Sequence, residues 1–243
     1  MSNITPDQVF TALHAWRCID LSVTIERGIP RWQAHPHLTI DPGITHEQDG
    51  YYCQSISMSE HTGTHVDAPA HVHADLMAQS IDQLSPEVFI GRAVVADLSP
   101  LALKEGEHAT LAEVQQALER HHLQPQAGDI VFFNFGWMRH WKSGREGKFY
   151  ASNQPGLSRE VADWVLHSEF KAIGSDTIAV GAAMVAGSNQ YCPFHYEVLR
   201  KVPMFECLAN LEKIDRPFLF LGAPLKIRAG SGAPVRALAF LPN

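Results

Sequence analysis

Short apolar runs recur along the chain, and they predict the strands of an α/β protein. Each run is rich in β-branched and aromatic residues, which favour strands over helices. The predicted strands cover residues 19–25, 93–98, 129–135, 204–209, 217–222 and 235–241.

Two other segments repeat their apolar residues with a helical period. Thr110 followed by Glu113 makes a capping box, a signal for the start of a helix, and predicts a helix over about 110–122. Ser158 is expected to cap a second helix over 159–170, whose apolar residues form one buried stripe. Strands and helices together indicate an α/β fold.

Residues 137–156 follow neither pattern. This segment is aromatic, basic and rich in turn formers, so we expect a long ordered loop. Loops of this length are usually functional lids or disordered, and the aromatic residues here favour order.

Composition limits the size of the fold and the kinds of partner. With 243 residues, 45% of them hydrophobic, the chain can bury one large core or at most two small ones, and we predict a single domain over 1–243. The net charge of −7 and the lack of a Lys/Arg run argue against nucleic acid as a partner. No apolar stretch approaches the roughly 18 residues of a membrane span, and the first residues do not resemble an export signal. We therefore expect a cytoplasmic protein without a membrane partner.

The four cysteines support the same expectation. Cys18, Cys53, Cys192 and Cys207 are scattered and show no CxxC spacing. This usage is typical of reduced thiols rather than of a disulfide framework, and we expect these side chains to pack in the core.

The stretch HTGTHVDAPAH at residues 61–71 contains the strongest candidate chemistry. His61, His65, Asp67 and His71 would share one face of a strand, but His61 and Asp67 would then lie roughly 20 Å apart. One metal ion could not bind both, since its bonds to ligands are only about 2.0 to 2.2 Å long.

Gly63 and Pro69 indicate how the stretch avoids this separation. Both residues disfavour a regular helix and suit a tight loop, which would fold the potential ligands inward. A single histidine more often caps a turn or satisfies a core hydrogen bond, but three with an aspartate in one loop favour a metal centre. The spacing matches neither helical HExxH motifs nor CxxC ribbons.

One loop rarely completes a catalytic metal site, so further ligands are expected elsewhere. His195 starts a predicted short helix over 194–201, and Glu206 lies in an apolar strand, where burial is costly unless the carboxylate is paired or bound to a metal. We expect caps, surface positions or loops for His35, His37, His46, His108, His121, His122, His140 and His167. For His73, two residues beyond His71, a role in the site stays open.

HTGTHVDAPAH resembles the HxGTHxDxPxH signature of the metal-dependent cyclase family, which includes bacterial kynurenine formamidase and isatin hydrolase. The resemblance extends to DLS at 20–22, IGSDT at 173–177, a histidine-to-glutamate pair near position 200, and GSGAPVR at 230–236. It implies a swivelling β/β/α domain, with the metal site inside a barrel-like mixed sheet surrounded by helices. It also implies a homo-oligomer, either a dimer or a tetramer.

The resemblance also implies a set of metal ligands. His61 and His65 would bind a first metal, and Asp67 would bridge two metals. His195 would bind the second metal, and Glu206 would be a further bridging carboxylate. Two histidines with carboxylates accept Zn²⁺ and Mn²⁺ alike, so the number of ions, one or two, and their identity stay open.

His71 would then be the catalytic base and acid rather than a ligand. Trp32 corresponds to a substrate-stacking tryptophan of the family, although RWQAHP stands here in place of a WPGD-like segment. Trp137 and Trp141 could also stack on an aromatic substrate, but ordinary core or interface packing is the favoured role for both.

These roles predict a metal-dependent hydrolase that cleaves an amide C–N bond of a small aromatic substrate. The metal would activate water and polarise the carbonyl, and His71 would move the proton to the departing nitrogen. N-formylkynurenine-type and isatin-type lactam substrates both match this chemistry. A dehydrating cyclase and a non-catalytic metal-binding protein are the alternatives.

Overall fold

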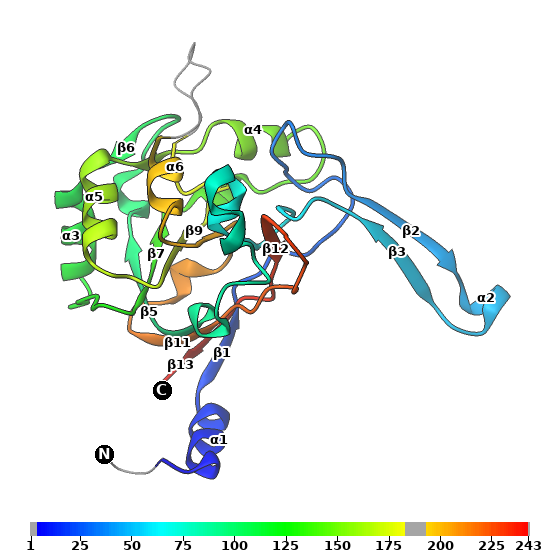
Figure 1. The fold of residues 1–243 in the computed structure, drawn as a ribbon, viewed down its shortest axis with the longest axis horizontal. Helices are drawn as coiled ribbons and strands as arrows, with labels where there is room; N and C mark the ends of the chain where they lie inside the picture. The colour runs from blue at the N-terminus through cyan, green and yellow to red at the C-terminus, as the bar shows by residue number, and fades with distance from the viewer. Residues whose placement is uncertain (1–3, 183–192, 243) are drawn as a thin grey trace.

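The computed structural model describes residues 4–182 and 193–242. Its centre is a nine-stranded mixed sheet that curls into a half-barrel, with strand order β1-β13-β11-β5-β7-β9-β10-β4-β12 (Figure 1). The strands are β1 (Arg17–Asp20), β4 (His65–Asp67), β5 (Ile90–Asp97), β7 (Ile130–Asn134), β9 (Ala172–Ser175), β10 (Met204–Glu206), β11 (Phe218–Leu221), β12 (Gly232–Pro234) and β13 (Leu238–Leu241). Strands β5, β7, β9 and β10 run parallel, and the outer pairs are antiparallel. The predicted α/β class and barrel-like mixed sheet are confirmed.

The central strands are mostly apolar because both faces of the sheet are covered. In β7, Val131 and Phe133 belong to the core on the helical side, whereas Ile130 and Phe132 belong to the core on the opposite side. Period-two alternation therefore sends each of these four apolar residues into one core or the other, which is typical of parallel strands.

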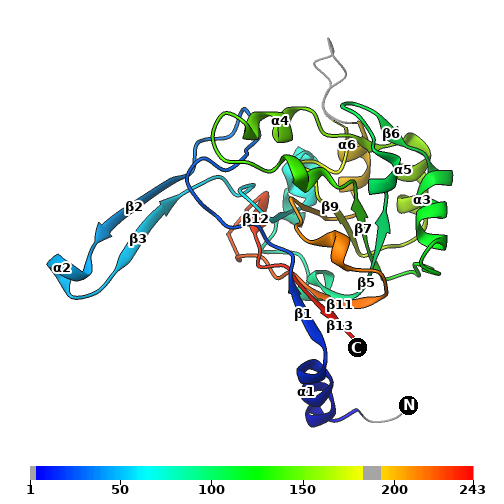
Figure 2. The same cartoon turned by 180° about the vertical axis from the view of Figure 1, so that it is seen from behind.

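The helices α3 (Leu111–Glu119), α5 (Arg159–His167) and α6 (Pro193–Leu199) pack on one face of the sheet (Figure 2). Their buried residues join the core on the helical side, so the predicted helical cover lies on that face. Among the helices of residues 4–182 and 193–242, none has the length and apolar character needed to cross a bilayer.

The predicted capping box starts α3. The Thr110 hydroxyl accepts from the Glu113 amide at 3.3 Å, and the Glu113 carboxylate accepts from the Thr110 amide at 2.7 Å. The helix ends at Glu119, before the predicted end at 122, because His122 has a left-handed backbone with φ of 52°.

The predicted capping role of Ser158 is wrong in its detail. Ser158 does hold the N-cap position of α5, but its hydroxyl donates to the Glu160 carboxylate at 2.7 Å and bonds no helix amide. The helix therefore starts where the sequence indicates, without a side-chain cap.

Two projecting elements were not predicted (Figures 1 and 2). Helix α1 (Pro6–Ala15) buries no residue, and the hairpin of β2 (Thr39–Ile44) and β3 (Cys53–Ser57), with α2 (His46–Asp49) at its tip, extends away from the sheet. Thr5 and Gln8 form a capping box at the start of α1, and this signal was readable in the sequence. The hairpin lacks such a signal because β3 is exposed along its whole length.

Residues 137–156 are ordered as expected, but they are not a simple loop. They contain a 3-10 helix at Trp137–His140 and α4 (Gly147–Ser152), and they lead into β8 (Gly156–Leu157), which pairs with β6 (His108–Ala109). Trp137 is 2% exposed and donates from its indole nitrogen to the Tyr150 carbonyl at 3.1 Å. Trp137 therefore packs in the core, which is the role that was favoured for it over stacking on a substrate.

The cysteines are placed differently from one another. Cys18, Cys53 and Cys207 are free thiols, as expected. Only Cys207 of these three is buried, so the predicted packing role is wrong for Cys18 and Cys53, which lie on exposed strands. Cys192 lies outside the described residues.

Candidate metal centre

A left-handed turn starts the HTGTHVDAPAH segment. Gly63 has a backbone φ of +66°, a conformation that residues other than glycine rarely adopt. The next residue anchors the turn, because the Thr64 hydroxyl accepts from the Val23 amide at 2.9 Å and donates to the Cys207 carbonyl at 2.7 Å. These bonds fix the segment to the chain beyond β1 and to the end of β10.

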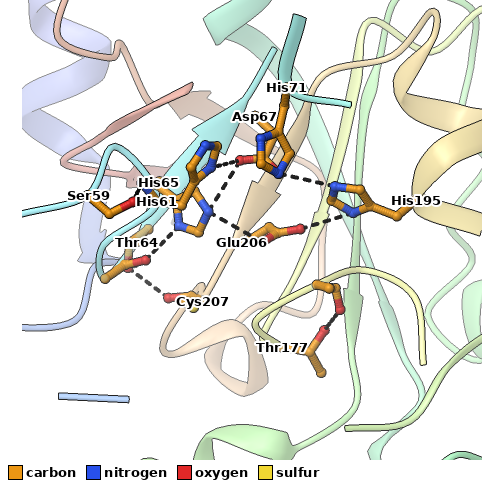
Figure 3. A network of polar contacts seen from close by, with 12 residues as sticks. Ser59, His61, Thr64, His65, Asp67, His71, Thr177, His195, Glu206 and Cys207 are labelled. Carbon is orange, nitrogen blue, oxygen red and sulfur yellow. Dashed lines mark hydrogen bonds and ion pairs between the residues drawn. The ribbon is translucent and has the colours of Figure 1, made fainter. Parts of the chain in front are cut away.

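The turn folds the potential ligands inward, as the sequence predicted. His61 Nδ1 lies 2.6 Å from Asp67 Oδ1, far closer than an extended chain would allow. A second turn at Pro69–His71 brings His71 Nε2 to 4.0 Å from Asp67 Oδ2, with the His61 and His71 rings 4.0 Å apart. The three side chains therefore face one point (Figure 3).

Strand register brings in the distant carboxylate. His65 of β4 pairs directly with Glu206 of β10, so the two side chains lie on the same face of the sheet. His195, at the start of α6, reaches the same place from the helical layer (Figure 3). The structure thus brings together all six residues predicted for the ligands and the catalytic base.

Donor separations in this cluster match those of atoms that share an ion. His65 Nε2 lies 3.3 Å from Asp67 Oδ1 and 3.3 Å from Glu206 Oε2. His195 Nε2 lies 3.3 Å from Asp67 Oδ2, and its Nδ1 lies 3.4 Å from Glu206 Oε1. Two ligand atoms about 2.1 Å from one ion at a tetrahedral angle stand about 3.4 Å apart.

Two atoms of the cluster are also left without a hydrogen bond. His195 Nδ1 and Glu206 Oε1 are buried, and although they lie within ion-pair distance, they do not form a hydrogen bond with each other or with another described residue. Burying such atoms unpaired is costly, so the cluster is suited to a cation that would take them as ligands.

Among the described residues, the donor atoms form two groups that could each hold an ion. One comprises His61, Asp67 and His71, and the other comprises His65, Asp67 and Glu206. Asp67 belongs to both, which is the arrangement of a bridging carboxylate. The groups divide the histidines differently from the sequence-based expectation, which placed His61 and His65 on one metal.

Hydrogen bonds to the far side of two rings orient them. His65 Nδ1 lies 2.8 Å from the Gly63 carbonyl, which assigns the proton to Nδ1 and leaves Nε2 free to bind a metal. His61 Nε2 lies 2.8 Å from Ser231 Oγ, and that hydroxyl donates to Glu60 at 2.6 Å, so Nε2 donates to Ser231 and Nδ1 is the atom that faces Asp67. Partners of this kind are typical of metal-binding histidines.

The pKa values show that the cluster attracts positive charge. Burial opposes ionisation of Asp67, but His61 and His71 hold its pKa well below the usual value. Burial and the charge of Asp67 raise the pKa of Glu206. Although burial lowers the pKa of His65, its hydrogen bonds to Asp67 and Glu206 outweigh this and raise the pKa to about 10. A bound cation would supply the positive charge that this protonation provides.

His71 differs from the other members of the cluster. Its side chain is 25% exposed, whereas that of Asp67 is 1% exposed. Burial lowers the pKa of His71 to about 3 even though Asp67 pulls it upward, so the ring is neutral at pH 7. A neutral imidazole at the open side of the cluster can accept a proton.

The cluster forms one wall of a cavity of about 280 Å³, a size suited to a small molecule. Trp32 lines this cavity. Trp141 packs edge-on against Tyr150 and is absent from the described lining of this cavity, which agrees with the packing role that was favoured for it.

Two lining residues were missed by the sequence-based reasoning. His35, expected as a cap or surface residue, lines the cavity with its ring 5.4 Å from that of His61. Gln154 lines it from the segment 137–156. No local pattern marks either side chain, and the nearest signal was the proximity of His35 to Trp32 in the sequence.

The remaining histidines behave as expected. His73 is buried between the Tyr196 carbonyl at 2.7 Å and Arg200 at 2.9 Å, which is a structural role outside the described cavity lining. Seven others are exposed or half-buried at the surface: His37, His46, His108, His121, His122, His140 and His167.

A curled mixed sheet with a buried histidine and carboxylate cluster defines an α/β protein with a candidate metal centre. The family model described as putative cyclase matches residues 19–182, and the chain belongs to this family.

The relatives of this chain include proteins named isatin hydrolase and kynurenine formamidase. Isatin hydrolase from Roseibium aggregatum is 29% identical over 196 residues, which cover 76% of this chain and 73% of that protein. Kynurenine formamidase from Bacillus cytotoxicus is 24% identical over 227 residues, covering 90% of this chain and 95% of that protein. The structure of isatin hydrolase A from Labrenzia aggregata bound to benzyl benzoate matches with a TM-score of 0.84 and 26% identity, over 98% of this chain and 99% of that one.

Proposed function

We propose that this protein is a metal-dependent hydrolase that cleaves an amide C–N bond of a small aromatic substrate. The observation that carries the proposal is the placement of one partly exposed histidine, His71, beside the buried donor group of His65, Asp67 and Glu206. The names of the relatives, isatin hydrolase and kynurenine formamidase, support the same chemistry.

His61, His65, Asp67, His195 and Glu206 would hold one or two divalent ions, Zn²⁺ or Mn²⁺. When bound, such an ion lowers the pKa of water toward 7 and polarises a carbonyl oxygen. The donor set of imidazoles and carboxylates suits either metal. The spacing of about 3.3 Å between donors and the two unpaired buried atoms support binding.

His71 would move the proton. As water attacks the carbonyl carbon, the imidazole accepts a proton from it, and as the C–N bond breaks it returns that proton to the leaving nitrogen. The products are an amine and a carboxylic acid, which releases its proton to solvent and becomes a carboxylate. Trp32, at the wall of the same cavity, would pack against the aromatic part of the substrate.

The decisive experiment assays purified protein, loaded with Zn²⁺ or Mn²⁺, on N-formylkynurenine and on isatin. Hydrolysis of either substrate that disappears on removal of metal by a chelator supports the proposal. Bound metal without turnover would instead indicate a non-catalytic member of the family, and ring formation from an acyclic acid would indicate a dehydrating cyclase.

We further propose that the chain acts as one domain in a cytoplasmic homo-oligomer, a dimer or a tetramer. Strands from Arg17 to Leu241 join one sheet, which supports a single domain. The projecting hairpin and α1 expose large apolar side chains, including Phe10, Tyr51 and Ile56, which support self-association. Light scattering on the purified protein would measure the number of copies.

A further inference from the structure

Gln154 joins the segment 137–156 to the cavity. Of the residues in this segment, all of which the structure describes, Gln154 alone lines the cavity wall. Its side chain is fully buried, and neither its Oε1 nor its Nε2 has a hydrogen-bond partner among the described residues. The chain therefore places one unsatisfied donor and one unsatisfied acceptor beside the candidate metal centre.

The unpaired state of Gln154 stands out within its own surroundings. The neighbouring Asn153 donates from its carboxamide to the Phe149 carbonyl at 3.1 Å, and the Trp137 indole donates to the Tyr150 carbonyl at 3.1 Å. Most buried polar side chains have a partner, because leaving one unpaired is unfavourable. Among the described residues Gln154 thus lacks the hydrogen-bond partners that a bound molecule in the cavity could supply.

Close backbone packing holds Gln154 in position. A Cβ atom on Gly156 would lie 1.9 Å from the Ala182 amide nitrogen, so the two backbones are in direct contact. Ala182 belongs to the cavity wall, together with Ile178 and Ala179. The Gly156 amide also donates to the Glu107 carbonyl at 2.9 Å. The backbone two residues beyond Gln154 is therefore fixed against the cavity wall, and the Gln154 side chain is fully buried there.

We infer that Gln154 is a specificity-determining residue, whose carboxamide pairs with a cis-amide edge of the substrate. A carboxamide carries an N–H and a C=O side by side on one edge, and a lactam carries the same pair in the complementary order. Two parallel hydrogen bonds would satisfy both buried atoms of Gln154 at once. The lactam carbonyl keeps its second lone pair, so the same oxygen can still face the metal cluster. The inference rests on the proposed amide hydrolysis.

Substrate geometry decides how many of these bonds form. An open-chain amide in the trans form directs its N–H and C=O to opposite sides, so it can satisfy only one atom of Gln154. A lactam methylated on nitrogen lacks the donor and leaves Gln154 Oε1 unpaired in the complex. Sites built to hydrogen-bond a substrate group discriminate strongly against analogues that lack it.

The test compares isatin with N-methylisatin, which differ at the nitrogen that would pair with Gln154. Wild-type protein should prefer isatin by about 10- to 100-fold in kcat/KM, in keeping with the loss of one buried hydrogen bond. Gln154→Met, which keeps the length of the side chain but removes both polar atoms, should reduce this preference to within about threefold. The loss should fall on isatin, with N-methylisatin little changed.

Gln33→Met serves as the matched control, because Gln33 is exposed on the loop that carries Trp32 and does not appear in the described cavity lining. It should leave the preference as in wild type. Metal content and melting temperature of Gln154→Met should equal those of wild type. Equal losses on both substrates, or an unchanged preference, would overturn the inference.

A binding measurement separates this inference from the proposed function. Titration of chelator-treated protein with isatin and N-methylisatin reports recognition without turnover. If no substrate is hydrolysed but isatin binds better, and Gln154→Met abolishes that preference, Gln154 keeps its assigned role and the proposed hydrolysis fails. If substrate is hydrolysed but the preference for isatin does not depend on Gln154, the proposed hydrolysis stands and the role assigned to Gln154 fails. Absence of both binding and turnover would overturn both.

Discussion

Asp176, just after β9, and Glu206, at the end of the neighbouring strand β10, are two buried carboxylates with different surroundings. Asp176 accepts hydrogen bonds from the backbone amides of Phe135, Trp137 and Met138. Glu206 has an oxygen without a hydrogen-bond partner among the described residues. Asp176 is 1% exposed and Glu206 is 3% exposed, so burial does not account for the difference.

The difference lies in the kind of group that surrounds each carboxylate. Backbone amides belong to the fold and can only donate, so Asp176 is satisfied by its own chain and serves the structure. The neighbours of Glu206 are His65 and His195, whose ring nitrogens can bind a metal as well as a proton. A buried carboxylate is thus a candidate metal ligand where its neighbours are histidine nitrogens that can themselves bind a metal. Where its neighbours are backbone amides, the carboxylate has a structural role.

Asp67→Ala would remove the carboxylate common to both donor groups, and it should have the largest effect. The variant should lose most of its bound metal and its activity, because each donor group would lose the carboxylate that it shares with the other. His61→Ala and His65→Ala should behave similarly. Elemental analysis measures the metal, with Asp176→Asn as the control that keeps it. Equal metal content in Asp67→Ala and wild type would show that Asp67 is not a metal ligand.

His71→Ala should reduce the rate of amide hydrolysis about 10²- to 10⁴-fold, the usual cost of losing a general base. The metal content should stay near that of wild type, because the buried donors remain. Assays in saturating Zn²⁺ and Mn²⁺ with parallel metal analysis measure both. If His71→Ala lost as much bound metal as Asp67→Ala, His71 would be a metal ligand in the group that contains His61.

Glu206→Gln should have a smaller effect, which is confined to one part of the cluster. Glutamine keeps the shape of the side chain but supplies a neutral and poorer bridge. Occupancy of the metal position that His195 completes should therefore fall more than occupancy of the other metal position. Metal stoichiometry should drop from two ions toward one. A wild-type protein that binds a single ion remote from Glu206 and His195 would contradict the two-metal arrangement.

Asp176→Asn should affect stability and its pH dependence, with metal content unchanged. Burial raises the pKa of Asp176 from 3.8 to about 6, although its backbone donors favour the charged form. The folded state therefore binds the proton more tightly than the unfolded state. This contribution to stability is fully present below pH 3.8 and is lost as the pH rises through 6.

Denaturant unfolding of wild type and Asp176→Asn from pH 4 to 7 measures this effect. The difference in unfolding free energy should change by about 3 kcal/mol across that window, since each pKa unit corresponds to about 1.4 kcal/mol. If the asparagine lowers the unfolding free energy by the same amount at every pH, the plot of that free energy against pH only shifts and keeps its shape. Parallel curves for the two proteins would show that Asp176 does not titrate there.

Much of the fold and of the cluster could be predicted because the signals are local. The capping box of Thr110 and Glu113 involves neighbours three residues apart, and the left-handed turn at Gly63 depends on the missing side chain of one residue. The apolar runs identified the central strands because both of their faces are buried. Close spacing of the residues in 61–71 likewise pointed to a shared site before any fold was known.

Tertiary structure alone decided which distant groups meet. The register of β4 and β10 places Glu206 opposite His65, and a slip of one residue would turn that carboxylate to the other face. Packing hid Trp137 in the core and turned His35 and Gln154 toward the cavity. Such outcomes depend on contacts between segments far apart in the chain, and a local pattern records only what one segment can do by itself.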